Sequence, residues 1–387
     1  MIKKSGAIIF QLLLLYFALN ASLLDFYKKG RIKLEADPNF GQQTAQSEPL
    51  YDTRCDFLRA PNGSLFIAST TEHCIYRYSP EGKFIGRYGQ EGRGPGDLHF
   101  PGDLSVLDGR YLVIGEYATS RRVSLFDLEG NFVKLLKTNR SAFTTVALRD
   151  KKIAFTTYEY GPMKNGIQEF TTIIIIKDVE TGEEAAIDEY RTQRKFIRSG
   201  GGGSYMVMGS GEMILTPTKD GNLLVGVTVS DELKIYSPQG KLLRSFQLRM
   251  EPVQVTRNYI QRYKDSRIQD MKDRGVRQSL IDAIEKTPYE DMFGKYLPHF
   301  KEVLVDSEGN ILICKITDCI GDCNEVFQVY SSEGEYICEV TIDCGIYEVT
   351  IDRRFKNIIF ADGAVYGLFP LKEDEESALQ LIRVKLR

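Results

Sequence analysis

The sequence predicts an all-β protein, a six-bladed β-propeller of four-stranded antiparallel blades with an α-helical insertion before blade five. Two repeated sequence phrases and one interruption of the β pattern lead to this prediction. The first phrase is a glycine turn followed by an apolar strand. It recurs at 63–67, 109–113, 221–225 and 309–313, with weaker copies at 152–155 and 357–360. Six copies indicate six blades, with seven blades as an alternative.

The first segment, residues 1–21, is typical of a signal peptide or an N-terminal anchor. Lys3 and Lys4 precede an apolar run over 7–19, and small residues follow at 20–22. An uncleaved anchor over 7–27 is the alternative, because about 21 residues suffice to span a bilayer. Either possibility predicts an exported protein (periplasmic, secreted or membrane-tethered) whose propeller occupies 22–387. Membrane contact would then come only through the anchor.

A second repeated phrase predicts how each blade is built. In this phrase the end of a strand leads into a turn that is closed by glycine. It recurs at 78–84, 126–132, 178–183, 236–242 and 330–336. Glycine supplies the positive φ that such tight turns need. Two hairpins per repeat make a four-stranded unit, which must stack on neighbours to bury both faces. Without the leader and the insertion, each repeat has about 54 residues, near the upper propeller periods.

The connection between blades one and two carries a family resemblance. Residues 90–101 read QEGRGPGDLHFP, and this glycine-rich segment resembles the loop between blades in the NHL-repeat family. Residues 123–132 extend the match. The resemblance is strong for blades one and two, moderate for four and five, and limited to hairpin spacing for three and six. It implies membership in the exported six-bladed bacterial propellers, a broad group mostly without assigned chemistry.

The interruption spans 255–297. Thr256 is a plausible N-cap for a first helix, Gly275 ends that helix, and apolar residues from Val276 to Ile284 mark a second. The insertion is either a packing elaboration or a lid over the mouth of the central channel. After blade five, 379–386 alternates apolar and charged residues like a final strand. Residues 31–35 are expected to pair near it and close the ring.

Candidate ligand-binding residues are those expected at the channel mouth, where the inner strands begin. They are Asp56, Asp103, His99, His299, Glu302 and Glu348. Carboxylates from different blades suit a divalent cation. The resemblance to gluconolactonase-like propellers, which use a metal in this way, stops at the fold. The competing interpretation is that these groups cap turns or face solvent. No metal or other cofactor is therefore assigned. A divalent cation nevertheless fits the pattern of carboxylates.

Composition narrows the partners. The chain of 387 residues has 50 Lys and Arg against 53 Asp and Glu, a formal net charge of −3, which argues against a nucleic-acid binder. Only three histidines are present, which nearly excludes a poly-histidine metal site.

Seven cysteines in an oxidising compartment predict two or three disulfides. The expected pairs are Cys55 with Cys74, Cys314 with Cys338, and Cys319 with Cys323. A cysteine-only zinc site is the rival, although a matching second pair at zinc-ligand spacing is missing.

The function predicted from the sequence is a non-catalytic binding or scaffold propeller of the cell envelope or exterior, which recognises a protein, peptide or glycan at one face. The first alternative is a metal-dependent hydrolase or lyase that acts at the channel mouth. A second is a sensor or assembly subunit whose insertion docks a partner. The fold alone does not decide among them, because propellers carry many unrelated activities.

Overall fold

The computed structural model describes residues 22–37, 39–40, 55–117, 121–198, 204–206, 211–273, 275–286, 289–320, 324–343, 358–370 and 379–386. The predicted leader, 1–21, lies outside these residues. No helix in the described part of the chain is long and apolar enough to cross a membrane.

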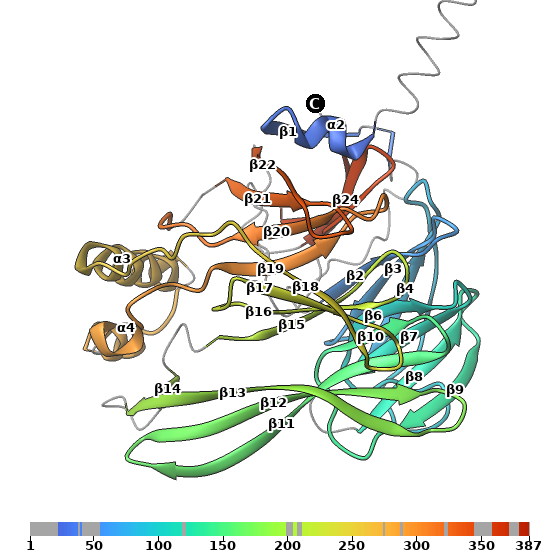
Figure 1. Ribbon diagram of the computed structural model, residues 1–387, viewed down its shortest axis with the longest axis horizontal. Coiled ribbons are helices and arrows are strands. Elements are labelled where there is room, and N and C mark those ends of the chain that lie inside the picture. The colour runs from blue at the N-terminus through green and yellow to red at the C-terminus, as the bar shows by residue number, and fades with distance from the viewer. Residues whose placement is uncertain are drawn as a thin grey trace, which may run out of the picture.

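The chain forms a ring of six four-stranded antiparallel blades, as predicted (Figure 1). Blade one holds β2 (Cys55–Arg59), β3 (Leu65–Ser69), β4 (Cys74–Tyr78) and β5 (Phe84–Tyr88). Blade two holds β6 (Pro101–Leu107), β7 (Tyr111–Glu116), β8 (Arg122–Asp127) and β9 (Phe132–Lys137). Blade three holds β10 (Thr145–Leu148), β11 (Lys152–Lys164), β12 (Ile167–Asp178) and β13 (Glu184–Arg198), with β14 (Ser204–Met206) added at its edge.

The second half of the ring follows the same plan. Blade four holds β15 (Met213–Pro217), β16 (Leu223–Val227), β17 (Glu232–Tyr236) and β18 (Leu242–Gln247). Blade five holds β19 (Phe300–Val305), β20 (Ile311–Lys315), β21 (Glu325–Tyr330) and β22 (Tyr336–Asp343). Blade six combines β23 (Ile358–Ala361), β24 (Ala364–Pro370) and β25 (Leu379–Leu386) with the N-terminal strand β1 (Arg31–Ala36).

The two ends of the chain close the ring together. Leu34 in β1 lies opposite Leu386 in β25, which confirms the expected pairing of these segments. The first half of β1 also pairs in parallel with β22, so blades five and six share one eight-stranded sheet. The short helix α2 (Leu23–Tyr27) precedes β1, and its Leu23 and Tyr27 are fully buried beside blades five and six.

The core consists of hydrophobic clusters between neighbouring blades, and every one of the six interfaces has such a cluster. Between blades one and two, for example, Phe66 of β3 packs with Leu104 and Ile114 of β6 and β7. Strands buried on both faces account for the continuous apolar runs in the sequence, such as Leu65–Ser69.

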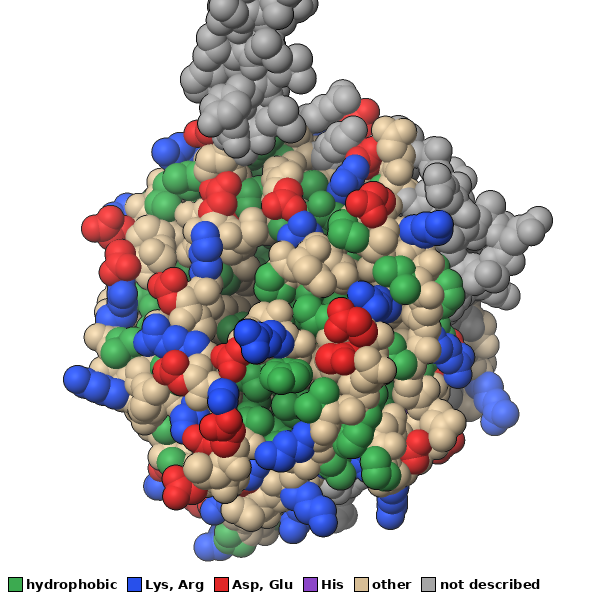
Figure 2. Space-filling model, turned by 90° about the vertical axis from the view of Figure 1, so that its right-hand side faces the viewer, with side chains coloured by type: hydrophobic (Ala, Val, Ile, Leu, Met, Phe, Trp, Pro, Cys, Tyr) green, Lys and Arg blue, Asp and Glu red, His purple; other side chains and the backbone are tan. Residues whose placement is uncertain are grey.

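Both repeated phrases place their turns on one face of the disc, which we name the turn face. The first phrase joins the first and second strands of a blade, and the second phrase joins the third and fourth. At Gly334 the φ angle is +86°, and a Cβ there would lie 2.4 Å from the ring of Phe246 in the preceding blade. Only glycine therefore fits this close approach. Figure 2 views the disc from the side opposite the insertion, so it shows the turn face, where hydrophobic side chains gather near the centre among charged ones.

The opposite face, which we name the insert face, carries the irregular connections. The hairpins of blade three extend there as strands of up to 15 residues, on the same side as the helical insertion (Figure 1). The insertion contains α3 (Arg257–Asp273), α4 (Gln278–Glu285) and the 3-10 turn η1 (Tyr289–Met292). The Thr256 hydroxyl oxygen accepts a hydrogen bond from the Tyr259 N–H at 3.1 Å, which confirms the predicted N-cap.

The predicted disulfide between Cys55 and Cys74 is wrong. Both residues carry reduced thiols. Cys55 in β2 and Cys74 in β4 both pair with Ser69 of β3, the strand that lies between β2 and β4. One strand therefore separates them, which puts their Cα atoms about 10 Å apart. A disulfide needs Cα atoms within about 7 Å.

The predicted disulfide between Cys314 and Cys338 is wrong for the same reason. Cys314 in β20 lies opposite Phe327, and Cys338 in β22 lies opposite Val329. Strand β21 stands between the two thiols, both of which are reduced.

Cys319 is the exception among the described cysteines, because it is disulfide-bonded. Its expected partner, Cys323, lies outside the described residues, so this pairing stays a prediction.

Candidate functional site

A central cavity of about 640 Å³ opens where the inner strands end, at the turn face. All six blades contribute to its mainly apolar wall. One such residue from each blade is Leu58, Leu104, Leu148, Pro217, Val305 and Ile359. Charged residues of both signs also line it, among them Arg59, Asp108, Arg149, Lys219, Asp220 and Asp306.

The five predicted channel-mouth residues that the structure describes do not line this cavity. They precede or begin the inner strands, whereas the cavity lies at the other end of those strands. Asp56 is 2% exposed, and its Oδ2 accepts a hydrogen bond from the Leu104 N–H of the next blade at 2.6 Å. Asp103 repeats the arrangement, with its Oδ2 accepting from the Thr145 N–H of blade three at 2.7 Å. These contacts join neighbouring inner strands, so both carboxylates stabilise the ring. A ligand role for them stays a prediction.

The remaining candidates are scattered. Glu302 is buried in β19, where its Oε1 accepts from the N–H of Val303 at 2.9 Å. Glu348 lies outside the described residues. His99 lies beside His73 and Glu91 between blades one and two, away from the central cavity.

Among the described candidates, His299 alone lines a second cavity, a groove of about 600 Å³ between the insertion and blade five. Its backbone is fixed on both sides, because its N–H donates to the Thr228 carbonyl at 2.7 Å and its carbonyl accepts from the Ile316 N–H at 3.1 Å. Its Nδ1 is buried and has no hydrogen-bond partner among the described residues. A buried nitrogen without a partner is energetically costly, so a ligand group that reaches it would be stabilised.

The groove wall combines aromatic rings with charges of both signs. Its charged residues are Arg249, Glu251, Arg262, Lys315, Asp318 and Glu339, and its aromatic ones are Tyr259 and Tyr336. The Lys315 ammonium pairs with the Glu339 carboxylate at 2.7 Å.

The backbone of Arg249, a residue of the groove wall, is fixed by hydrogen bonds. Its N–H donates to the Tyr330 hydroxyl oxygen at 2.8 Å, and its carbonyl accepts from the Gln328 amide at 2.6 Å. The Tyr330 hydroxyl in turn donates to Gln328 Oε1 at 2.7 Å. Burial raises the pKa of Tyr330, which keeps this hydroxyl neutral. The Arg249 guanidinium lies over the Tyr336 ring, 4.6 Å from its centroid, and is thereby oriented along the groove wall.

The insertion forms the other wall. Its two ends are joined by backbone hydrogen bonds, from Val255 N–H to the Lys295 carbonyl at 3.0 Å and from Leu297 N–H to the Val253 carbonyl at 2.9 Å. From α3, Arg262 donates to the Asp318 carbonyl of blade five at 3.0 Å. Of the residues that the structure describes, those lining the groove come from the end of blade four, the insertion and blade five. The insertion therefore packs beside blade five, and the residues of the groove give no support to a lid over the central channel.

Sequence reasoning identified His299 and the insertion but missed Arg249, Arg262 and Tyr336. No spacing pattern links these three, because they come from the end of one blade, a helix and the outer strand of the next blade. The position of the insertion was the only signal for a groove there.

No family model matches the chain, and no curated protein matches it. Solved structures do resemble it. A Bacteroides fragilis protein named as exported is 13% identical, with a TM-score of 0.51, and the match covers 92% of this chain and 99% of that one. A member of the DUF4221 family from Bacteroides vulgatus is 12% identical over the same shares of the two chains, with a TM-score of 0.47. A streptogramin B lyase is 11% identical, with a TM-score of 0.41 over 86% of this chain and 78% of that one. At these identities, the first match supports the propeller fold and nothing finer.

Proposed function

We propose that the protein is a non-catalytic binding propeller that holds a peptide segment of another protein in the groove between the insertion and blade five. The observation that carries the proposal is the buried, unpartnered Nδ1 of His299 in the wall of a groove of about 600 Å³. A ligand that hydrogen-bonds to this nitrogen removes an energetic penalty of the unbound protein.

The charges of the groove favour a peptide over a glycan. Arg249, Glu251 and Arg262 are exposed side chains of the groove wall. A neutral sugar that covers them would leave desolvated charges without partners, which is unfavourable. A peptide with side chains of both signs, and with carbonyl groups for the guanidinium donors, compensates these charges.

The hydrolase or lyase alternative lacks a comparable observation. It requires carboxylates that converge on one metal at the channel mouth, and the carboxylates of Asp56 and Asp103 accept hydrogen bonds from backbone N–H groups of the neighbouring blades. For location, we propose export to the cell envelope or exterior, on the basis of the leader-like segment 1–21 and of the exported protein that shares the fold.

A peptide display library screened against the full chain tests the proposal, with a panel of neutral and acidic oligosaccharides in parallel. We expect selected peptides whose affinity falls about tenfold in Arg262→Ala. The matched control is Arg257→Ala, because Arg257 is exposed on the same helix but does not line the groove. Peptides that bind both variants equally, or a screen in which only oligosaccharides bind, would overturn the proposal.

A further inference from the structure

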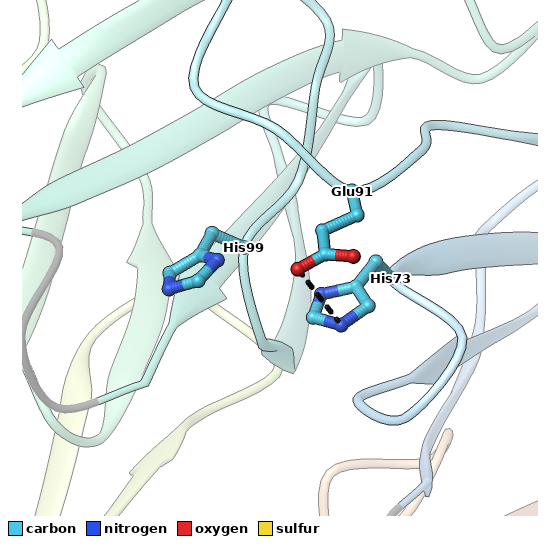
Figure 3. Close-up of side chains that lie close together, drawn as sticks. All are labelled: His73, Glu91 and His99. Carbon is cyan, nitrogen blue, oxygen red and sulfur yellow. Dashed lines mark ion pairs between the residues drawn. The ribbon is translucent and has the colours of Figure 1, made fainter.

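A second cluster of potential ligand groups lies on the insert face between blades one and two. His73 is at the tip of the β3–β4 hairpin, and Glu91 and His99 come from the connection that leads to blade two (Figure 3). One ligand atom from each of the three side chains lies within 4.8 Å of the other two. In the described part of the chain, no other group of three histidine, cysteine or acidic residues meets this distance.

The connection that carries Glu91 and His99 is folded by its own hydrogen bonds. The Leu98 N–H donates to the Gln90 carbonyl at 2.8 Å, and an isolated β-bridge joins Glu91 to Leu98. These contacts bring Glu91 next to the residue that precedes His99, although the two are separated in sequence by a glycine-rich loop. Asp97 stabilises that loop, because its carboxylate accepts from the Gly94 N–H at 2.8 Å and from the Gln90 amide at 3.0 Å.

The buried carboxylate of Glu116 fixes the backbone of His99. The His99 N–H donates to Glu116 Oε2 at 2.9 Å. Glu116 is 2% exposed, and its other oxygen accepts from the Arg122 guanidinium at 2.9 Å and from the Ser124 hydroxyl at 2.7 Å. This network holds the backbone N–H of His99 and does not involve its imidazole.

The histidine rings are held close by strained backbone. His73 and Phe100 both have positive φ, +55° and +58°, although neither is glycine. The two imidazole rings are stacked, with centroids 5.9 Å apart and an interplanar angle of 19°. Phe100 contacts both rings, at centroid distances of 5.1 and 4.3 Å. Strained residues that persist in a well-defined structure often mark functional positions.

We propose that His73, Glu91 and His99 bind one divalent transition-metal ion, for which Zn²⁺ is the best match. Two imidazole nitrogens and one carboxylate oxygen are donors that zinc accepts, whereas Ca²⁺ and Mg²⁺ prefer oxygen alone. Tetrahedral coordination places ligand atoms about 3.3 Å apart. The Glu91 side chain can move to shorten the distances between the ligand atoms, because it is 70% exposed. Its Oε1 already lies 4.0 Å from Nε2 of His73.

Metal binding at His73 requires the ring proton to change position. In the unbound protein its Nδ1 accepts a weak hydrogen bond from the Phe100 N–H at 3.3 Å, so Nε2 carries the proton of the neutral ring. Coordination through Nε2 moves this proton to Nδ1 and ends the Phe100 contact. Three protein ligands leave the fourth zinc position to water or to a group from a partner. The ion would link the blade-one hairpin to the connection that leads into blade two.

The test uses the full chain, purified without a histidine tag, dialysed against EDTA and titrated with Zn²⁺ in competition with a chromophoric chelator. We expect one bound zinc per chain. Affinity should fall more than about a hundredfold in His99→Ala and in His73→Asn, because each removes a direct ligand. Asparagine is chosen for position 73 because it tolerates the left-handed backbone. Co²⁺ should give the visible absorption of a tetrahedral site in the wild type and in neither variant.

The chain provides its own matched control, since His299 is the third histidine and lies outside the cluster. His299→Ala should bind zinc as the wild type does. Glu91→Gln alters an exposed side chain and should fold normally but bind zinc about tenfold more weakly. Absence of zinc binding up to millimolar concentration would overturn the proposal. So would unchanged binding in His99→Ala and Glu91→Gln, which would assign the zinc to other groups such as the thiols.

Discussion

The two faces of the disc are built on different principles. On the turn face, short turns recur in nearly the same form from blade to blade, and their polar groups bond to one another. Asp306 shows this, because its Oδ1 accepts from the N–H groups of Glu308 and Asn310 at 2.9 and 2.8 Å. On the insert face, the described connections differ from one another, and that face carries the long hairpins of blade three, the helical insertion and the cluster of His73, Glu91 and His99.

The difference shows how a repeat protein divides its tasks. Repeated turns fix strand order and register, so changes there affect the whole ring. Irregular connections are attached to a scaffold that stands without them, so they are free to carry binding groups. We therefore expect substitutions on the turn face to lower stability and leave binding intact. Changes on the insert face should do the reverse.

The largest effect is expected for Asp306→Ala on the turn face. Asp306 is 4% exposed and also accepts from the Tyr27 hydroxyl at 3.1 Å and from the Asn310 amide at 2.8 Å. Its removal leaves the buried Tyr27 hydroxyl and three part-buried N–H donors without this partner, so the free energy of unfolding should fall by about 3 kcal/mol. Urea denaturation measures the loss.

Asp127 gives a matched comparison, because it makes the same turn with Glu129 and Asn131 at a more exposed position. Asp127→Ala should cost about 1 kcal/mol, since water can replace the lost partner. Equal losses for the two variants would mean that burial does not set the cost of these turns. Loss of zinc or peptide binding in either variant would contradict the separation of the faces.

An intermediate effect is expected when the insertion, 256–296, is replaced by a short glycine–serine linker. The insertion has its own hydrophobic cluster, which includes Ile268, Ile281 and Tyr289. The ring should therefore stay folded, with its free energy of unfolding lowered by less than about 2 kcal/mol. Peptide binding should be lost, and zinc binding should be retained. Circular dichroism and urea denaturation check the fold, and an unfolded product would make the insertion part of the scaffold.

The smallest effect concerns the thiols of blade five. Burial raises the pKa of the Cys314 thiol well above its usual range, and burial also raises that of Cys338, which is partly exposed. Thiolate is the reactive form, so both should alkylate slowly at pH 7.5, Cys338 before Cys314. Mass spectrometry after iodoacetamide treatment gives the order. Removal of the insertion should change the rates by less than about twofold if blade five belongs to the scaffold. Faster labelling of Cys314 than of Cys338 would contradict this account.

The sequence allowed good prediction of what repeats. Turn glycines and strand patterns gave the six blades, the two insertion helices and the closing pair of strands, because each depends on neighbouring residues. The predicted pairs Cys55–Cys74 and Cys314–Cys338 failed because the order of strands along the chain does not say whether a third strand lies between two cysteines. The channel-mouth residues were expected where the inner strands begin, and their ligand role stays a prediction. The central cavity lies at the other end of those strands, and strand order alone does not tell which end stays open.

The cluster of His73, Glu91 and His99 could not be predicted for a related reason. Its two histidines come from different connections, and their proximity depends on the backbone hydrogen bonds that fold the glycine-rich loop. The groove at His299 depends in the same way on how the insertion packs beside blade five. Such sites arise from contacts between irregular segments, for which the sequence has no periodic signal.

The closing strand β1 has a consequence for how the protein is made. Its antiparallel partner, β25, lies near the other end of the sequence. The ion pair of Asp37 with Arg383 likewise joins residues 346 positions apart. During synthesis or export from the N-terminus, Leu34, which is buried in the finished disc, lacks its strand partner until 379–386 arrives. We therefore expect the ring to close only once 379–386 has been made, and a chain that lacks 379–386 to remain open and prone to aggregation.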